Sequence, residues 1–371
     1  MGNRSSVQPA GPPPLLSAAV IGDATKFVES WKGEDSIGLR DGQENNVLHA
    51  LFSCRGADSA SKCSKLLGLV HDSVPFSRLK SAYGSPNAIG CTPLWILVAY
   101  GNVAVLKEAR QKFADNDETD DFLGILRQSN NQGDSPLLAT CSQGNTDMVR
   151  FYREEFLAAD EFNAAIAEAN QKGTTPLQII VGNNHVSLLE YVLQTGETAV
   201  RKQLMEYNKA GLSLFHVSSE RNAHEILQMI LVFMMDKEQS EESIEKLTDV
   251  LSLKDKNGAN ALHVAAFCGN VEAVNVWIGA IKDAQSENNK SSKESTAAVL
   301  DVPDGQGRTA YWLAMVQGRD EIGRILSDEG VDTAGPKMVD EIEEAQERRS
   351  KAAARRQQQN RTLDGSALLN Q

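Results

Sequence analysis

One phrase returns eight times along this 371-residue chain, and it constrains the fold more than any other feature. Its clearest copy reads NGANALHVAAFCGNVEAVNVWI from Asn257, and IGCTPLWILVAYGNVAVL from Ile89 shows the same order of residue types. Further copies begin at Leu15, Asn45, Gln132, Lys172, Ala210 and Gln306. A unit of this size cannot bury its apolar face alone, so we expect the copies to stack around one continuous core.

Each copy carries the start and stop signals of two short helices. A Gly precedes a Thr, Ser or Asn that can cap a helix, and in several copies a Pro follows at the first helical position. Apolar residues at helical spacing then indicate a second helix, as in the stretch that begins at Val186. A further Gly is expected to end the first helix, at Gly22, Gly101, Gly144, Gly269 and Gly318.

The copies resemble the ankyrin repeat, whose signature T-P-L-H-x-A lies inside a unit of 33 residues. The resemblance covers residues 15–333 and implies an all-α ankyrin-repeat solenoid of about eight helix–turn–helix units. The positions that correspond to the signature His lie 33 to 49 residues apart, so most units are longer than the family's. We therefore expect lengthened helices and loops, with inserts that are helical at 155–169 and 242–250 and looped at 115–121 and 285–295.

Residues 1–14 are rich in Pro, Gly and Ser, and we expect them to be disordered. The first six residues, MGNRSS, match the motif for myristate on Gly2. A single myristoyl chain binds membranes weakly, with an association constant on the order of 10⁴ M⁻¹. The sequence therefore predicts a cytoplasmic protein whose contact with the inner face of a membrane is peripheral and reversible.

Residues 334–371 leave the repeat pattern. A charged helix is predicted from Met338 to Gln359, with acidic residues first and basic residues later, which suits the helix dipole. Two interpretations stay open: a helix that covers the last repeat, or a helix that binds a partner or a lipid surface. The basic run RRSKAAARR also fits a nuclear import signal.

The sequence gives no sign of an enzyme, a cofactor or a metal site. Phosphate-loop and nucleophile-elbow motifs are missing, and the five cysteines lack the spacing of a zinc site. The net charge of −13 argues against nucleic acid as the ligand. The resemblance implies that His49, His216 and His263 hydrogen-bond between neighbouring turns, while Trp95 and Trp312 in the same position are expected to fill a wider gap.

The expected ligand is another protein rather than a small-molecule substrate. In the ankyrin family, partners contact the concave face, at the ends of the first helices. The corresponding residues here are Tyr100, Gln143, Asn183, Glu220, Arg221 and Phe267. The sequence thus favours an interaction scaffold or adaptor, and the alternatives are a regulatory or assembly-chaperone subunit that caps an enzyme complex, and a nuclear cofactor.

Overall fold

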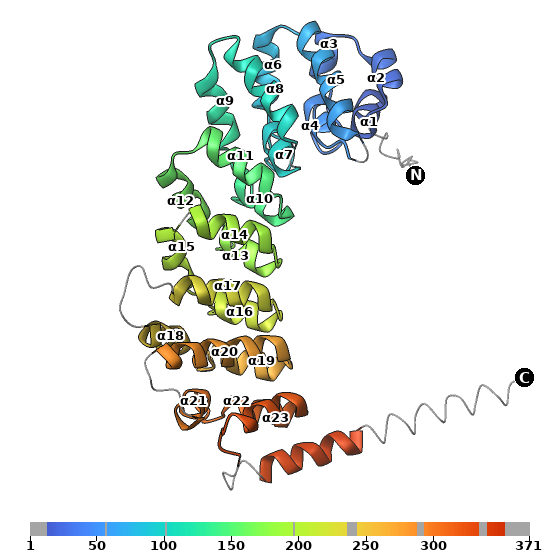
Figure 1. Ribbon diagram of the computed structural model, residues 1–371. Helices are drawn as coiled ribbons and strands as arrows, with labels where there is room; N and C mark the ends of the chain where they lie inside the picture. Colours follow the sequence, from blue (N-terminus) through green and yellow to red (C-terminus); the bar gives the residue numbers. More distant parts are fainter. Residues whose placement is uncertain are drawn as a thin grey trace, which may run out of the picture. The chain divides into compact units, whose positions relative to one another are not determined.

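The computed structural model describes residues 13–55, 58–100, 102–195, 197–235, 243–287, 293–333 and 340–352. Every regular element within these ranges is a helix (Figure 1). The chain divides into two compact units, an N-terminal unit of residues 1–200 and a C-terminal unit of residues 201–371. The expected all-helical repeat class is confirmed.

The N-terminal unit is built from sets of a first, a second and a third helix. The first helices are α1 (Pro14–Ile21), α4 (Val47–Phe52), α7 (Pro93–Ala99), α10 (Pro136–Gln143) and α13 (Pro176–Gly182). The second helices are α2 (Ala24–Ser30), α5 (Ser59–Ser73), α8 (Val103–Ala114), α11 (Thr146–Phe156) and α14 (Val186–Thr195). The third helices are α3 (Glu34–Ile37), α6 (Phe76–Tyr83), α9 (Thr119–Leu126) and α12 (Ala159–Ala167). The next helix, α15 (Glu197–Leu204), runs across the division between the two units.

The C-terminal unit repeats the same order. Its first helices are α16 (Leu214–Glu220), α19 (Ala261–Cys268) and α22 (Ala310–Gln317). Its second helices are α17 (His224–Met235), α20 (Val271–Glu287) and α23 (Asp320–Asp328). Its third helices are α18 (Ser243–Ser252) and α21 (Lys293–Leu300), and a further helix spans 340–352.

Successive first helices pack against one another within each unit. In the N-terminal unit α1 packs on α4, α4 on α7, α7 on α10, and α10 on α13. In the C-terminal unit α16 packs on α19 and α19 on α22, and Figure 1 shows these three in successive layers. Their apolar side chains, such as Leu48, Leu94 and Leu262, are at most 1% exposed, so the first helices form the centre of each stack.

The third helices correct the expectation of helix–turn–helix units with longer loops. The residues beyond two helices form a helix of their own, even in the shortest repeat, where α3 follows α2. The insert at 155–169 contains α12 and the insert at 242–250 contains most of α18, as expected. Of the two inserts predicted as loops, 115–121 is a turn up to Glu118 and then enters α9, while 285–295 holds the end of α20 and the start of α21, and its residues 288–292 lie outside the described residues. Phe122 and Leu300 on these helices are 0% and 1% exposed, so burial of apolar side chains accounts for them.

A five-residue turn precedes each first helix from α4 onward, and the described turns share one arrangement. The Oδ1 atom of the first residue accepts hydrogen bonds from the backbone N–H groups of the third and fifth residues, at 2.7 to 3.2 Å. The first residues are Asp41, Asn87, Asn130, Asn170, Asn208, Asp255 and Asp304. Backbone bonds join neighbouring turns, for example from Asn131 N–H to Ile89 O at 3.0 Å. This ladder fixes the spacing between repeats.

In four repeats the side chain at the signature position, that of His49, Trp95, His216 or His263, links the first helix to the following turn. His49 Nε2 donates to the carbonyl of Cys91 at 2.9 Å, and His263 Nε2 donates to that of Arg308 at 3.2 Å. Trp95 Nε1 makes the same bond, to the carbonyl of Asp134 at 2.9 Å. Each acceptor is the fifth residue of the next turn. Trp95 therefore does more than fill a gap, because its indole N–H replaces the imidazole donor.

The helix at 340–352 covers the last repeat. Among the described residues no five-residue turn follows α22, and Trp312 Nε1 donates instead to Glu341 Oε2 at 2.9 Å. Arg349 donates from Nη2 to the carbonyl of Met315 at 3.0 Å, and Ile342 is 8% exposed. The first of the two interpretations of this segment fits these contacts. Residues 338–339 and 353–359 of the predicted helix lie outside the described residues.

Candidate interaction surfaces

Three of the expected contact residues lie at the ends of neighbouring first helices in the N-terminal unit. Tyr100 is the C-cap of α7, Gln143 is the last residue of α10, and Asn183 is the C-cap of α13. All three are exposed, and Tyr100 is 41% exposed. Since α7, α10 and α13 pack in succession, these residues form one line, which we name the N-terminal row.

The N-terminal row is held by contacts that the sequence did not indicate. The Arg55 guanidinium carbon lies 3.6 Å from the centroid of the Tyr100 ring, a cation–π contact. Asn183 Nδ2 donates to the carbonyl of Ser142 at 3.2 Å, and His185 Nε2 donates to the same carbonyl at 3.0 Å. The row is therefore ordered by contacts from neighbouring repeats, the preceding one at Tyr100 and the following one at Ser142.

The other three expected residues lie in the C-terminal unit. Glu220 ends α16, Arg221 is its C-cap, and Phe267 lies one residue before the end of α19. All three are exposed, and Phe267 is 48% exposed although it is a large aromatic residue. We name them the C-terminal row. Asn270 Nδ2 donates to the carbonyl of Glu220 at 2.8 Å, which ties α16 to the following repeat.

The residues beside Tyr100 and Gln143 are less exposed than those two residues are. Ala99 beside Tyr100 is only 5% exposed. Ser142 beside Gln143 is half-buried and lends its carbonyl to two donors. One residue for each of these two helices, rather than two, is open to a partner. Gly2 and Gly101 lie outside the described residues.

Burial shifts the pKa values of four side chains, Cys63, Cys91, His49 and His71, toward their neutral forms. It raises the pKa of the Cys63 thiol to about 12 and that of Cys91 to about 11. It lowers the pKa of His49 to about 4, so this imidazole stays neutral at pH 7 and keeps one donor for the following turn. His71, for which the sequence gave no role, contacts the Tyr83 hydroxyl at 2.9 Å, and burial lowers its pKa to about 4.

The described part of the chain contains neither a metal-ligand cluster nor a membrane-spanning helix. No group of three or more His, Cys, Asp or Glu side chains is arranged to hold a metal ion there. Nor does that part include a helix with the length and apolar character needed to cross a membrane.

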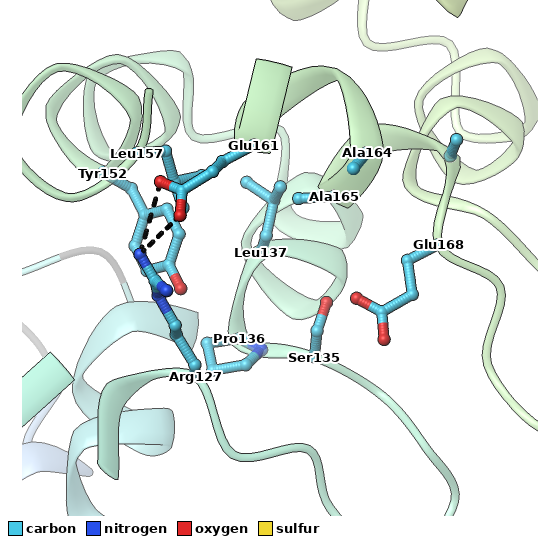
Figure 2. A pocket seen from close by; sticks show the side chains of 11 residues that line it. Arg127, Ser135, Pro136, Leu137, Tyr152, Leu157, Glu161, Ala164, Ala165 and Glu168 are labelled. Atoms are coloured by element: carbon cyan, nitrogen blue, oxygen red, sulfur yellow. Dashed lines mark hydrogen bonds and ion pairs between the residues drawn. The ribbon is translucent and has the colours of Figure 1, made fainter. Parts of the chain in front are cut away.

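A pocket of about 500 Å³ opens at the other end of α10 from the N-terminal row (Figure 2). It lies between the start of α10, the end of α9, and the helices α11 and α12, and we name it the α10–α12 pocket. Its apolar lining includes Leu137, which is 2% exposed, Leu157 and the small residues Ala164 and Ala165. No sequence motif marked this pocket, because its lining comes from positions that the repeat pattern treats as helix starts and inserts.

Polar groups sit on two sides of the α10–α12 pocket. Arg127 Nη2 lies 3.3 Å from Glu161 Oε1 and donates to the carbonyl of Phe156 at 3.1 Å, so its charge is paired. Figure 2 shows Glu168 on the opposite side, with its carboxylate directed toward Ser135. Burial raises the pKa of the Tyr152 hydroxyl to about 12, with Arg127 acting against the rise and Glu168 adding to it.

Comparison with known proteins gives one partial likeness. Over 195 residues, or 51% of this chain, the sequence is 23% identical to leucine-rich repeat serine/threonine-protein kinase 1 of Caenorhabditis elegans. The matched stretch makes up 7% of that protein. No protein-family model matches the chain. At this identity and coverage the likeness assigns neither a family nor an activity.

Proposed function

We propose that this chain is an ankyrin-type repeat protein that binds another protein, as a scaffold or adaptor, through the ends of its first helices. The observation that carries the proposal is the pair of exposed aromatic residues, Tyr100 and Phe267, at those helix ends. Aromatic and Arg side chains on a rigid support supply much of the binding energy in protein interfaces. Here the hydrogen-bonded turns and the stacked helices provide that support.

The ankyrin assignment is supported by contacts as well as by the sequence. The side chain at the signature position donates to the following turn at His49, Trp95, His216 and His263. This is the role that the resemblance gives to the signature His. A third helix in most repeats departs from the family's two-helix unit, and we propose that it widens each repeat without changing this link.

The direct test is recovery of a partner from extract of the native host. The variant Tyr100→Ala, Arg221→Ala, Phe267→Ala removes the large side chains from both rows. We expect its affinity for the recovered partner to fall more than about tenfold, as for the loss of interface hot spots. The control, Val28→Ala with Val232→Ala, removes side chains that are 54% and 60% exposed elsewhere and should bind as the wild type does. Equal affinity of all three proteins would rule out the rows.

The same experiment separates adaptor from subunit. A stable one-to-one complex with a single enzyme on gel filtration would favour the regulatory or assembly-chaperone alternative, and several partners would favour a scaffold. The nuclear alternative has less support, because the described bases of its import run are engaged. Arg348 pairs with Glu344 and Lys351 with Glu347, while Arg349 holds the carbonyl of Met315.

We propose a non-catalytic role in the cytoplasm, with peripheral membrane contact through myristate on Gly2. The support is the MGNRSS start and the lack of phosphate-loop and nucleophile-elbow motifs. Intact mass spectrometry of the protein from its native host should show Met1 lost and one myristoyl group gained. A Gly2→Ala variant should then leave the membrane fraction, and an unmodified wild-type mass would refute this part of the proposal.

A further inference from the structure

The α10–α12 pocket combines an apolar floor with two polar groups that have no partner in the described structure. Tyr152 is 4% exposed, yet no described residue hydrogen-bonds to its hydroxyl. Its oxygen is not among the enclosed polar atoms that lack a partner, so a ligand in the pocket can reach it and hydrogen-bond to it. Glu168 is exposed, and the described residues include no cation paired with its carboxylate. Both groups line the pocket and are open to a ligand.

The charges of the lining favour a cation. Arg127 is neutralised by Glu161 at 3.3 Å and by the carbonyl of Phe156, so Glu168 supplies the net charge of the pocket. The whole chain carries a net charge of −13, which adds attraction for a basic partner at long range. An anionic or purely apolar group would leave the Glu168 carboxylate without a counter-charge.

The shape of the lining selects among cations. Leu137, Leu157 and Ala165 offer an apolar wall beside the two polar groups, in about 500 Å³ of space. An arginine side chain matches this arrangement. Its aliphatic stem covers the apolar wall, while its planar guanidinium donates to a carboxylate and a hydroxyl together. A metal ion would leave the apolar wall uncovered. A lysine stem could cover that wall, but its compact ammonium lacks the planar fork that spans a carboxylate and a hydroxyl together.

We propose that the α10–α12 pocket receives an arginine side chain of a partner protein, with the guanidinium bound by Glu168 and the Tyr152 hydroxyl and the stem packed on Leu137. The proposal rests on the protein-binding function above and adds a second contact on the opposite end of α10 from the N-terminal row. The sequence pattern gave no hint of it, because α12 lies in an insert.

The test uses peptides as probes and the full chain as the receptor. A random peptide library is selected on the wild type and counter-selected on Ala164→Arg, which places a long basic side chain in the pocket. We expect the enriched peptides to contain Arg next to apolar residues. Replacing that Arg by citrulline, a neutral analogue of similar shape, should weaken binding about tenfold, since a charged hydrogen bond is lost.

Variants of the protein, measured with both the arginine and the citrulline peptide, complete a double-mutant cycle. Glu168→Gln should weaken the arginine peptide about tenfold and leave the citrulline peptide unchanged, because the two changes remove the same interaction. Tyr152→Phe should weaken the arginine peptide less, as it removes one hydroxyl. Glu190→Gln, a matched change of an exposed carboxylate on α14, should have no effect. Peptides without enriched Arg, or equal binding to wild type and Glu168→Gln, would overturn the proposal.

Failure of the pocket assignment can be distinguished from failure of the proposed protein-binding function. If the row variant loses the partner while the wild type selects no arginine peptide, or binds one no better than Glu168→Gln does, only the pocket assignment fails. If the row variant also keeps the partner, the proposed function fails with it.

Discussion

Replacing Gly144 by Ala should destabilise the N-terminal unit by about 2 kcal/mol. Gly144 ends α10 with φ +67°, a left-handed conformation that costs an L-residue about 1–2 kcal/mol. A Cβ atom there would lie 2.5 Å from Nδ1 of His185, so the imidazole must move and its hydrogen bond to the carbonyl of Ser142 is lost. Losing that bond costs about 1 kcal/mol. Ala also lowers the conformational entropy of the unfolded chain relative to Gly, which offsets about 0.5–1 kcal/mol of the destabilisation.

The chain contains a matched control in Gly182, which ends α13 in the next repeat. It has no neighbouring atom within 4 Å of an added Cβ. Gly182→Ala should therefore stabilise the protein by about 0.5–1 kcal/mol, the ordinary gain for Ala over Gly in a helix. Urea unfolding followed by circular dichroism measures both variants.

A second substitution isolates the clash from the backbone strain. In a His185→Ala background the obstructing ring is absent, so Gly144→Ala should cost about 1 kcal/mol less than in the wild type, because only the backbone strain remains. If Gly144→Ala is no more destabilising than Gly182→Ala, then the close packing of His185 against the end of α10 does not contribute to stability.

Three further predictions concern the turns, the buried imidazoles and the C-terminal helix. Glu44 has φ 61° where the other described turns have Gly, so Glu44→Gly should raise the unfolding free energy by about 0.5–1 kcal/mol, and an unchanged urea midpoint would contradict this. The pKa of His49 and of His71 is about 4 in the fold against about 6.5 in the unfolded chain, so the unfolded state takes up protons first. The unfolding free energy should fall as pH drops from about 6.5 toward 4 and stay level above 7, and a flat profile in urea titrations would refute the burial of these rings. Arg349→Ala should cost about 1 kcal/mol and speed hydrogen exchange in residues 340–352, whereas equal exchange would mean that the helix does not depend on the carbonyl of Met315.

Sequence reasoning could find the first and second helices because their signals are local. A cap such as Thr92, a Pro at the next position and a Gly at the helix end each act on the neighbouring backbone, and the structure shows Thr92 accepting from Trp95 N–H at 3.1 Å. The [Asp/Asn]-x-x-Gly turn is also local and was open to detection, as in the turn that Asn130 begins.

The third helices and the pocket could not be read in the same way. α9 begins within a run of acidic residues that reads as a loop, and it is helical because Phe122 and Leu126 are buried, with the Phe122 ring packed on those of Phe113 and Phe156. Contacts such as Arg55 on Tyr100 join residues 45 positions apart, and a spacing of that kind carries no local signature. The exposed residues of the rows were predictable from helix ends, whereas the α10–α12 pocket depends on how α12 packs.

The two proposed contacts lie at opposite ends of one short helix, and this constrains the size of the partner. α10 runs from Pro136 beside the pocket to Gln143 in the N-terminal row, and seven helical steps span about 10 Å. A folded partner easily covers that distance, whereas one arginine side chain in the pocket does not reach the row. Row variants should therefore leave arginine-peptide binding intact while weakening the folded partner. Glu168→Gln should weaken both ligands only if the partner inserts an arginine, so comparing the two ligands assigns each contact to its own end of α10.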